Sequence, residues 1–315
     1  MVDLSGKTVL VTGATNGIGL EASVGLARMG ASLVMVGRSP AKLAAKVQEV
    51  RQRSGSSAVE SLTCDFSSQA QIRRIANEFR LRQERLHILV NNAGAAFANR
   101  TVTEDGIEST FALNHLGYFL LTRLLLDLLV QSAPARVVNV ASAAHYSGTM
   151  RFEDLGFERG YRIMRAYARS KLANVLFTRE LARRLEGTGV TVNSLHPGAV
   201  ATGIWNGAPG WIRPVINLAS RLLMLTPAEG AEAILYLATS PDVEGKTGLY
   251  FEKNLSKSPS PLALDDALAS RLWDRSSELV KLAAPIPLAR PPTESVDGPL
   301  AMGNIQPRRR AAPES

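Results

Sequence analysis

Residues 8–19 read T-V-L-V-T-G-A-T-N-G-I-G, and this stretch decides the fold. Its first five residues form the apolar, β-branched run typical of a buried strand. A turn with the spacing G-x-x-x-G-x-G then leads into a helical pattern over about 17–29. Such a turn brings main-chain amides at a helix N-terminus close to a pyrophosphate, whereas the alternative is a helix-entry turn without a ligand. The residues that we expect to bind a dinucleotide here are Gly13, Thr15, Asn16, Gly17, Ile18 and Gly19.

Strand and helix patterns alternate along the rest of the chain. Further strands are predicted at 32–36, 58–63, 87–90, 136–140, 190–195 and 248–251, and further helices at 41 onward, 67–83, 113–131, 166–185 and 228–238. Continuous apolar strands separated by helices indicate a parallel sheet covered on both faces. The predicted fold class is therefore α/β, a single Rossmann-type doubly wound sheet of about seven strands in the order 3-2-1-4-5-6-7.

Two stretches, 143–165 and 203–225, interrupt this alternation. Both follow the carboxyl ends of strands, which is the edge where ligands bind in such folds. We predict one catalytic domain over 1–284 with these stretches as substrate loops. Residues 285–315 are rich in Pro, Ala and Arg and have no periodicity, which predicts a disordered tail.

Composition excludes several classes of protein. The 315 residues include one cysteine, so no intrachain disulfide can form. The apolar stretch 119–130 is interrupted by Arg123 and Asp127 and is too short for a bilayer, so we expect no integral membrane segment and a cytoplasmic protein. The net charge of +8 could serve nucleic acid, anionic lipid or an anionic cofactor, but no nucleic-acid-binding motif accompanies it. The four histidines have no ligand spacing, so no metal is expected.

The end of the second strand indicates which dinucleotide binds. NAD-binding proteins usually carry an acidic residue there, for the ribose 2′-hydroxyl. Here the sequence is Val36-Gly37-Arg38, with no carboxylate. A guanidinium at this place would bind a 2′-phosphate, although a solvated arginine is the plain alternative. NADP(H) is therefore preferred, and NAD(H) is possible.

Downstream motifs complete a family resemblance. In order along the chain they resemble those of the short-chain dehydrogenase/reductase family, over roughly residues 5–255. Around the last motifs the sequence is similar to the retinol dehydrogenase branch, in residues 114–122 and 170–178. The motifs are the glycine turn, Asn91-Asn92-Ala93-Gly94, Asn114, Ser142, Tyr167-Ala168-Arg169-Ser170-Lys171 and Pro197-Gly198.

The resemblance implies four catalytic residues, and simple chemistry supports two of them. Tyr167 and Lys171 are four apart on one predicted helix and so share a face. A nearby ammonium would lower the pKa of the phenol, which could then act as a general acid or base. The resemblance assigns Ser142 to the substrate carbonyl, Asn114 to a water linked to Lys171, and Lys171 also to the nicotinamide ribose. Each taken alone could be an ordinary polar residue, and Tyr161 with Arg165 repeats the spacing upstream of the predicted helix.

Further cofactor contacts follow from the same resemblance. Asp65 would bond the adenine amino group or cap a helix, and the residues after the fourth and sixth strands would flank the adenine ribose and the carboxamide. The remaining residues expected to bind the cofactor are Phe66, Asn92, Ala93, Gly94, Pro197, Gly198, Val200 and Thr202.

The substrate is expected to be an apolar small molecule. Both predicted loops carry apolar and aromatic residues, which either line a ligand site or pack the loops onto the body. The resemblance suggests a retinal-like aldehyde, a lipid aldehyde or a steroid-like ketone. It also implies a homodimer or homotetramer through apolar stripes on the helices 113–131 and 166–185, unless these stripes only face the sheet. Two alternatives remain open, an enone reductase and a catalytically silent nucleotide-binding regulator.

Overall fold

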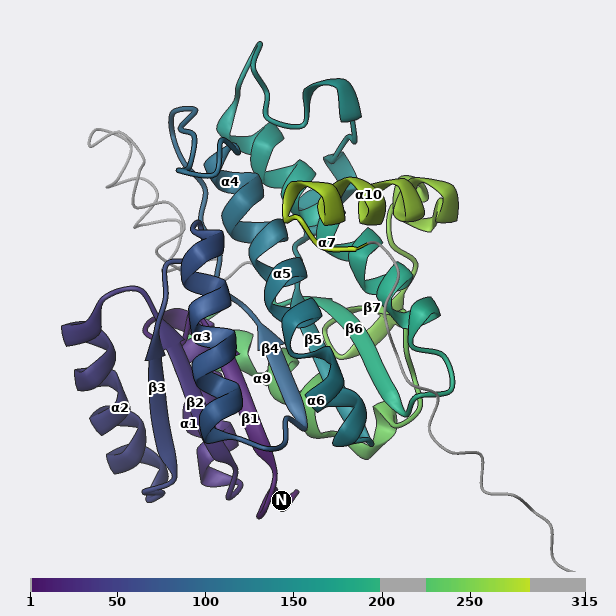
Figure 1. Cartoon of the computed structure of the whole chain (residues 1–315). Coiled ribbons are helices and arrows are strands. Elements are labelled where there is room, and N and C mark those ends of the chain that lie inside the picture. The colour runs from purple at the N-terminus through teal and green to yellow at the C-terminus, as the bar shows by residue number, and fades with distance from the viewer. Residues whose placement is uncertain (1, 199–224, 284–315) are drawn as a thin grey trace, which may run out of the picture.

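The computed structural model describes residues 2–198 and 225–283. Its one sheet has eight strands in the order β3-β2-β1-β4-β5-β6-β7-β8, and all neighbours are parallel except β7 and β8 (Figure 1). The predicted fold class and strand order are confirmed, with the short antiparallel β8 as an addition. The strands are β1 (Thr8–Thr12), β2 (Ser32–Gly37), β3 (Val59–Thr63), β4 (Ile88–Asn91), β5 (Ala135–Val140), β6 (Val190–His196), β7 (Tyr250–Glu252) and β8 (Leu255–Lys257).

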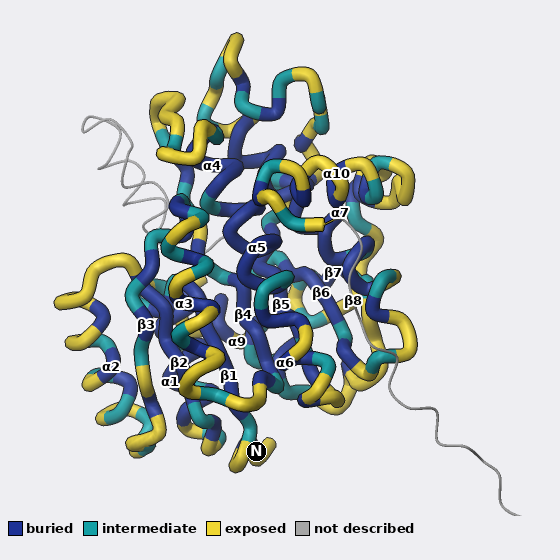
Figure 2. Tube along the Cα trace, viewed as in Figure 1, coloured by how far each residue is buried: buried dark blue, intermediate teal, exposed yellow. Residues whose placement is uncertain are grey.

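Helices cover both faces of the sheet and bury two apolar layers (Figure 2). On one face lie α1 (Gly17–Arg28), α2 (Pro40–Ser54) and α9 (Pro227–Thr239). On the other lie α3 (Gln69–Arg82), α4 (Ser109–Phe111), α5 (Gly117–Leu124), α6 (Leu126–Gln131), α7 (Ile163–Arg184) and α10 (Asp266–Leu279). Short single turns are η2 (Ala143–Ser147), η3 (Phe152–Asp154), η5 (Pro241–Val243) and η6 (Pro261–Leu264). None of the helices described is both long and apolar enough to cross a membrane.

The predicted continuous helix 113–131 is wrong in detail. The helical run begins at Ser109 with α4 and continues through the π-helical turn η1 (Ala112–Leu116) into α5. Leu125 then separates α5 from α6. A π-helical turn inserts one extra residue and frees main-chain groups from the regular ladder, and such turns gather at functional sites. Here the turn contains Asn114, which is fully buried. The predicted helix 166–185 begins earlier, at Ile163, so Arg165 lies inside α7.

Helix α10 is absent from the sequence prediction and covers the outer side of α5 and α7 (Figure 1). The Trp273 ring lies 5.0 Å from the ring of Phe119 on α5 and 6.1 Å from the ring of Phe177 on α7. The signal for this helix is local: Asp265 accepts a hydrogen bond from the Leu268 amide as an N-cap, and apolar residues follow at helical spacing.

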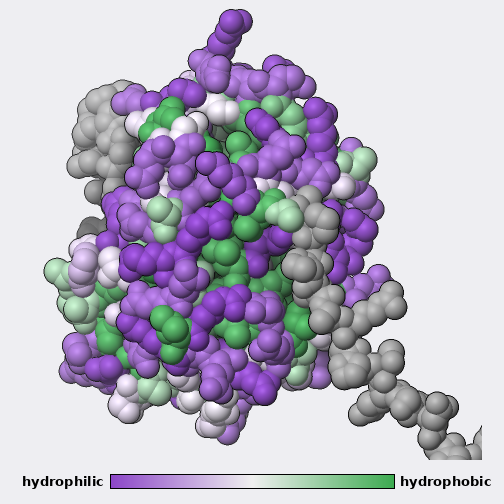
Figure 3. Space-filling model, in the orientation of Figure 1, coloured by the Kyte–Doolittle hydropathy of each residue, from purple (hydrophilic) through white to green (hydrophobic). Residues whose placement is uncertain are grey.

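The apolar stripes expected at a dimer interface are occupied within one chain. Six of the seven stripe residues are buried in the monomer, and only Leu124 is half-buried; the buried ones are Leu116, Leu120, Leu128, Leu172, Val175 and Leu176. The face drawn in Figure 3 is largely hydrophilic, and hydrophobic residues show in the middle of this face, along α5 and α6, and in smaller patches near the top and at the lower left. A dimer through these helices therefore stays a prediction whose expected contact residues already pack inside the chain.

Candidate active site

The glycine-rich turn is pressed against the end of β4. Asn92 Nδ2 donates to the Thr12 carbonyl at 2.8 Å and to the Gly13 carbonyl at 3.2 Å. Gly13 has φ +66°, and a Cβ on Gly19 would lie 2.4 Å from the Gly13 oxygen. Only glycine fits a turn this tight. The structure thus brings Asn92 and Ala93 to the glycine-rich turn, and their predicted place beside the adenine ribose stays a prediction.

The N-terminus of α1 has the donors that an anion needs. Asn16 is the N-cap residue, but its side chain makes no bond to the helix amides. Its Oδ1 instead accepts a hydrogen bond from Lys42 Nζ at 2.6 Å. Uncapped amides beside a lysine fit the pyrophosphate of a dinucleotide, since amides and helix dipole both favour negative charge there.

Two cationic side chains flank the ends of β2 and β3. Arg38 follows β2, has a 77% exposed side chain, and lies 3.9 Å from Asp65. Lys42, in the first turn of α2, is also exposed and reaches the glycine-rich turn. Sequence analysis missed Lys42, although its place one turn beyond Ser39-Pro40 at the start of a helix is a usable signal. Asp65 accepts bonds from the Ser67 amide and hydroxyl, while Ser68 caps α3.

Asn114, Ser142, Tyr167 and Lys171 come together at the carboxyl ends of β4 and β5. Tyr167 and Lys171 lie one turn apart on α7, and Lys171 Nζ is 5.6 Å from the Tyr167 ring centre. Lys171 Nζ also donates to the Val140 carbonyl at 2.9 Å, next to Ser142. Ser142 is half-buried and hydrogen-bonds to Tyr167. Four groups that are far apart in sequence thus form one cluster.

Asn114 connects this cluster to the residues that follow β4. Its side chain exchanges two bonds with the main chain of Ala95, at 2.9 and 3.0 Å, and donates to Ser170 Oγ at 3.0 Å. A Cβ on Gly94 would lie 3.2 Å from Asn114 Oδ1 and 3.6 Å from Lys171 Nζ. Phe66, which is buried, packs beside Gly117 just after the π-helical turn. The predicted cofactor and catalytic residues are therefore contiguous.

Burial governs the electrostatics of the cluster. Burial raises the pKa of Tyr167, and its hydrogen bond with Ser142 opposes this. Burial lowers the pKa of Lys171 to about 7. The expectation that the lysine ammonium lowers the pKa of the phenol is thus wrong for the protein alone, because removing both groups from water disfavours both charged forms. The result is a neutral phenol, which can donate a proton.

The apolar residues of the stretch 143–165 mostly pack onto the body. Leu155 and Phe157 are buried, and Met150 and Phe152 pack against the core below α10. Arg169 fixes the segment: its guanidinium donates to the carbonyls of residues 149, 154 and 155 and lies 3.6 Å from the Phe157 ring centre. Of the two readings of this loop, the structure favours packing for these residues.

The other predicted residues either lie apart from the cluster or fall outside the described part of the chain. Pro197 and Gly198 follow β6 at the same edge of the sheet, and Gly198 has φ +88°. Val200, Thr202, the stretch 203–224 and the tail 285–315 lie outside the described residues. Tyr161 of the rival pair donates to the Phe97 carbonyl at 2.6 Å, and its partner Arg165 is exposed. Within the described part of the chain, no group of three His, Cys, Asp or Glu side chains could hold a metal ion.

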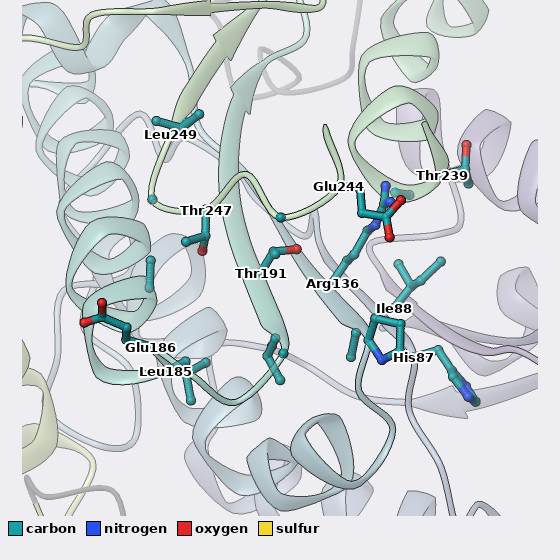
Figure 4. A pocket seen from close by; sticks show the side chains of 18 of the residues that line it. His87, Ile88, Arg136, Leu185, Glu186, Thr191, Thr239, Glu244, Thr247 and Leu249 are labelled. Carbon is teal, nitrogen blue, oxygen red and sulfur yellow. The ribbon is translucent and has the colours of Figure 1, made fainter. Parts of the chain in front are cut away.

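A cavity of about 900 Å³ lies at the opposite edge of the sheet, beside the amino ends of β4, β5 and β6 (Figure 4). Its lining includes His87, Arg136, Thr191 and Glu244, but none of the four clustered residues. Arg136 already donates to two main-chain carbonyls there. We place the candidate active site at the carboxyl edge because Ser142, Tyr167 and Lys171 meet there beside the glycine-rich turn, and none of them lines this cavity.

Comparison with known proteins agrees with this geometry. The family model of the short chain dehydrogenases matches residues 7–211. Retinol dehydrogenase 14 of Mus musculus is 44% identical over 291 residues, which cover 88% of this chain and 86% of that protein. Retinol dehydrogenase 13 of Homo sapiens is 42% identical over 287 residues, covering 90% of this chain and 87% of that protein.

Solved structures show the same fold. A protein of Mycobacterium paratuberculosis superimposes with a TM-score of 0.75 at 31% identity, over 91% of this chain and 97% of that one. The RhlG/NADP active-site complex of Pseudomonas aeruginosa gives a TM-score of 0.64 at 27% identity, over 85% and 98% of the two chains. The resemblance seen in the motifs is confirmed: this chain belongs to the short-chain dehydrogenase family of oxidoreductases, which bind a nicotinamide cofactor, and is similar to its retinol dehydrogenases.

Proposed function

We propose that the protein is an NADP(H)-dependent oxidoreductase that interconverts a carbonyl and an alcohol on an apolar small molecule, of the retinal-like or lipid-aldehyde kind. The observation that carries the proposal is the buried cluster of Tyr167, Lys171 and Ser142 beside the glycine-rich turn. The likeness to proteins named retinol dehydrogenases supports the substrate class.

The chain's own residues then act on protons and charge. NADPH, when bound, supplies the hydride. Tyr167 Oη donates its proton to the substrate oxygen, because burial keeps the phenol neutral. Ser142 Oγ donates a hydrogen bond to the same oxygen and stabilises the charge that develops on it. Lys171 holds the nicotinamide ribose, and Asn114 holds the water that returns a proton to the tyrosine.

The preference for NADP(H) rests on two cations. Arg38 follows β2, and Lys42 lies in the first turn of α2 and reaches the glycine-rich turn. In a Rossmann-type fold the adenine ribose lies near the end of the second strand, so a 2′-phosphate on this ribose would lie near both cations. A phosphate dianion there would pair with both, and Asp65 already turns toward Arg38 without closing a short ion pair.

The test is NADPH oxidation with all-trans-retinal, a long-chain aldehyde and a steroid ketone as separate substrates, with the products identified by chromatography. The wild type should form alcohols, and Tyr167→Phe should lose at least about 100-fold in kcat while still binding NADPH. Tyr161→Phe, which removes the bonds to the Phe97 carbonyl and the Thr110 hydroxyl, is the matched control and should keep its turnover.

Other outcomes decide against the proposal. A product in which a carbon–carbon double bond is saturated and the carbonyl retained would identify an enone reductase. NADPH binding with no turnover of any substrate would identify a silent nucleotide-binding regulator. Full activity in Tyr167→Phe would refute the assigned proton donor.

A further inference from the structure

We infer that His145 is a positioning residue that holds the catalytic serine turn in place by bridging the Ser142 carbonyl to the main chain of Ser260. The inference rests on the proposed role of Ser142. It concerns a residue of the predicted substrate loop 143–165, to which the sequence analysis gave no catalytic role.

The bridge fixes which nitrogen of the ring carries the proton. The Ser260 amide, which can only donate, lies 3.1 Å from His145 Nε2. Nε2 must therefore carry its lone pair, and the proton of the neutral ring sits on Nδ1. His145 Nδ1 lies 2.7 Å from the Ser142 carbonyl oxygen and donates to it. The His145 main-chain amide donates to the same oxygen at 3.1 Å.

The ring has no freedom to turn away from this bridge. His145 is fully buried, and it packs against the rings of Tyr146 and Tyr250 at centre distances of 4.1 and 4.6 Å. Tyr146 is anchored in turn, because its hydroxyl donates to the Ser258 carbonyl at 2.9 Å. Two hydrogen bonds thus join η2 to Ser258 and Ser260, between β8 and η6, and His145 and Ser260 are 115 residues apart in sequence. The Tyr250 ring on β7 packs against both rings of η2.

The charges around the ring favour its neutral form. Burial lowers the pKa of His145, while the hydrogen bond to the Ser142 carbonyl and the charge of Glu252 on β7 oppose the shift. His196 on β6 is a further titratable neighbour, and the Tyr146 and Tyr250 phenols complete the surroundings. Protonation of Nε2 would bring its N–H against the N–H of Ser260 and break the bridge.

The consequence for catalysis follows from what else Ser142 does. Its Oγ accepts a bond from the Ala144 amide at 3.2 Å and hydrogen-bonds to Tyr167. On the carboxyl side of Ser142, the group that can be held by a hydrogen bond is its main-chain carbonyl. By fixing that carbonyl, His145 fixes the peptide plane and the direction of the hydroxyl. A donor that stabilises a developing oxyanion must be placed accurately, since a shift of about 1 Å can reduce the rate by about 100-fold.

Two variants separate the two halves of the bridge. In His145→Asn the amide nitrogen stands at the place of Nδ1 and can still donate to Ser142, but the bond to Ser260 is lost. In His145→Gln the amide oxygen stands at the place of Nε2 and can accept from Ser260, but the bond to Ser142 is lost. His145→Ala removes both.

The experiment measures kcat and KM for NADPH-dependent reduction of all-trans-retinal. We expect His145→Ala to lose about 100-fold in kcat with KM nearly unchanged. His145→Asn should recover most of this loss and His145→Gln little. In a Ser142→Ala background, His145→Ala should cause no further loss, because a residue that acts through Ser142 has nothing left to position.

A merely structural role would give other results. Additive losses in the double variant, better rescue by His145→Gln than by His145→Asn, or a change in KM alone would each overturn the inference. Nitrogen-15 NMR of the wild-type imidazole is a readout that needs no substrate: it should show Nδ1 protonated and Nε2 bare, and the opposite tautomer would overturn the bridge. If the wild type reduces none of the three substrates, the proposed function fails, and the NMR result still decides the bridge.

Discussion

Two regions of this protein use cationic side chains, and they surround them in opposite ways. At the ends of β2 and β3, the Arg38 side chain is 77% exposed, and its Nη1 lies 3.9 Å from Asp65 Oδ2. Between α5 and α7, Lys171 is only 3% exposed, and its ammonium has the Val140 carbonyl as its hydrogen-bond partner.

The difference shows how each region can work. Water and salt screen an exposed guanidinium, so it keeps its charge and adds a modest preference for an anionic ligand. A buried lysine loses hydration, and its pKa falls to about 7. The first region selects a ligand by charge, whereas the second holds groups whose protonation depends on the packing around them.

Loss of packing around the buried region should have the largest effect. Trp273→Ala removes the ring that contacts Phe119 and Phe177 and seals α10 onto α5 and α7. We expect the free energy of unfolding to fall by about 3–5 kcal/mol, measured by urea denaturation. Arg275→Ala, at an exposed position of the same helix, is the control and should change stability by less than about 0.5 kcal/mol. Equal effects of the two variants would show that α10 does not support the cluster.

Titration of Lys171 should have the next largest effect. Above its folded pKa of about 7 the folded protein binds fewer protons than the unfolded chain, whose lysine has a pKa of 10.5. Stability should therefore rise with pH between about 7 and 10, by up to about 1.4 kcal/mol per pH unit for this one proton. Tyr167, whose pKa is raised from 10.0, has the opposite effect only above that range.

The measurement is urea denaturation at several pH values without cofactor, for the wild type and for Lys171→Met. The rise of the free energy of unfolding with pH should be smaller in Lys171→Met, because the variant lacks the proton of this lysine. Parallel curves for the two proteins would mean that Lys171 keeps an ordinary pKa in the folded state.

Changes in the exposed region should have the smallest effect. Arg38→Ala and Lys42→Ala should each reduce the preference for NADPH over NADH, in kcat/KM, by about 10-fold, since each removes one charged hydrogen bond from a solvated site. Turnover with NADH should stay the same, and high salt should narrow the difference. Lys46→Ala, on the same helix but paired with Glu49, is the matched control. An unchanged preference in both variants would exclude these side chains as phosphate ligands.

Much of the candidate site is local in the sequence and was predictable. The glycine spacing after the first strand, the pair Tyr167 and Lys171 one turn apart, and Arg38 in place of an acid each lie within a few residues of the element that positions them. Alternating strands and helices likewise predict the sheet order, because right-handed crossovers leave few other topologies.

The missing parts depend on residues that are distant in the sequence. Lys42 is recognised as part of the site only because it binds Asn16, which is 26 residues away. His145 is recognised as a bridge only because it binds Ser260, which is 115 residues away. The apolar residues of the stretch 143–165 have the composition of a ligand pocket, yet Leu155 and Phe157 pack on the body, and composition cannot distinguish these two uses.

The sequence by itself determined the fold class, the cofactor turn and the identity of the clustered groups, because strand and helix periods and glycine spacing are local properties of the chain. Only the tertiary structure decided the charge states of Tyr167 and Lys171, the cover that α10 provides, and the tautomer of His145. These depend on how much water each group loses and on which donor or acceptor faces it, and both are set by elements that meet only after the chain has folded.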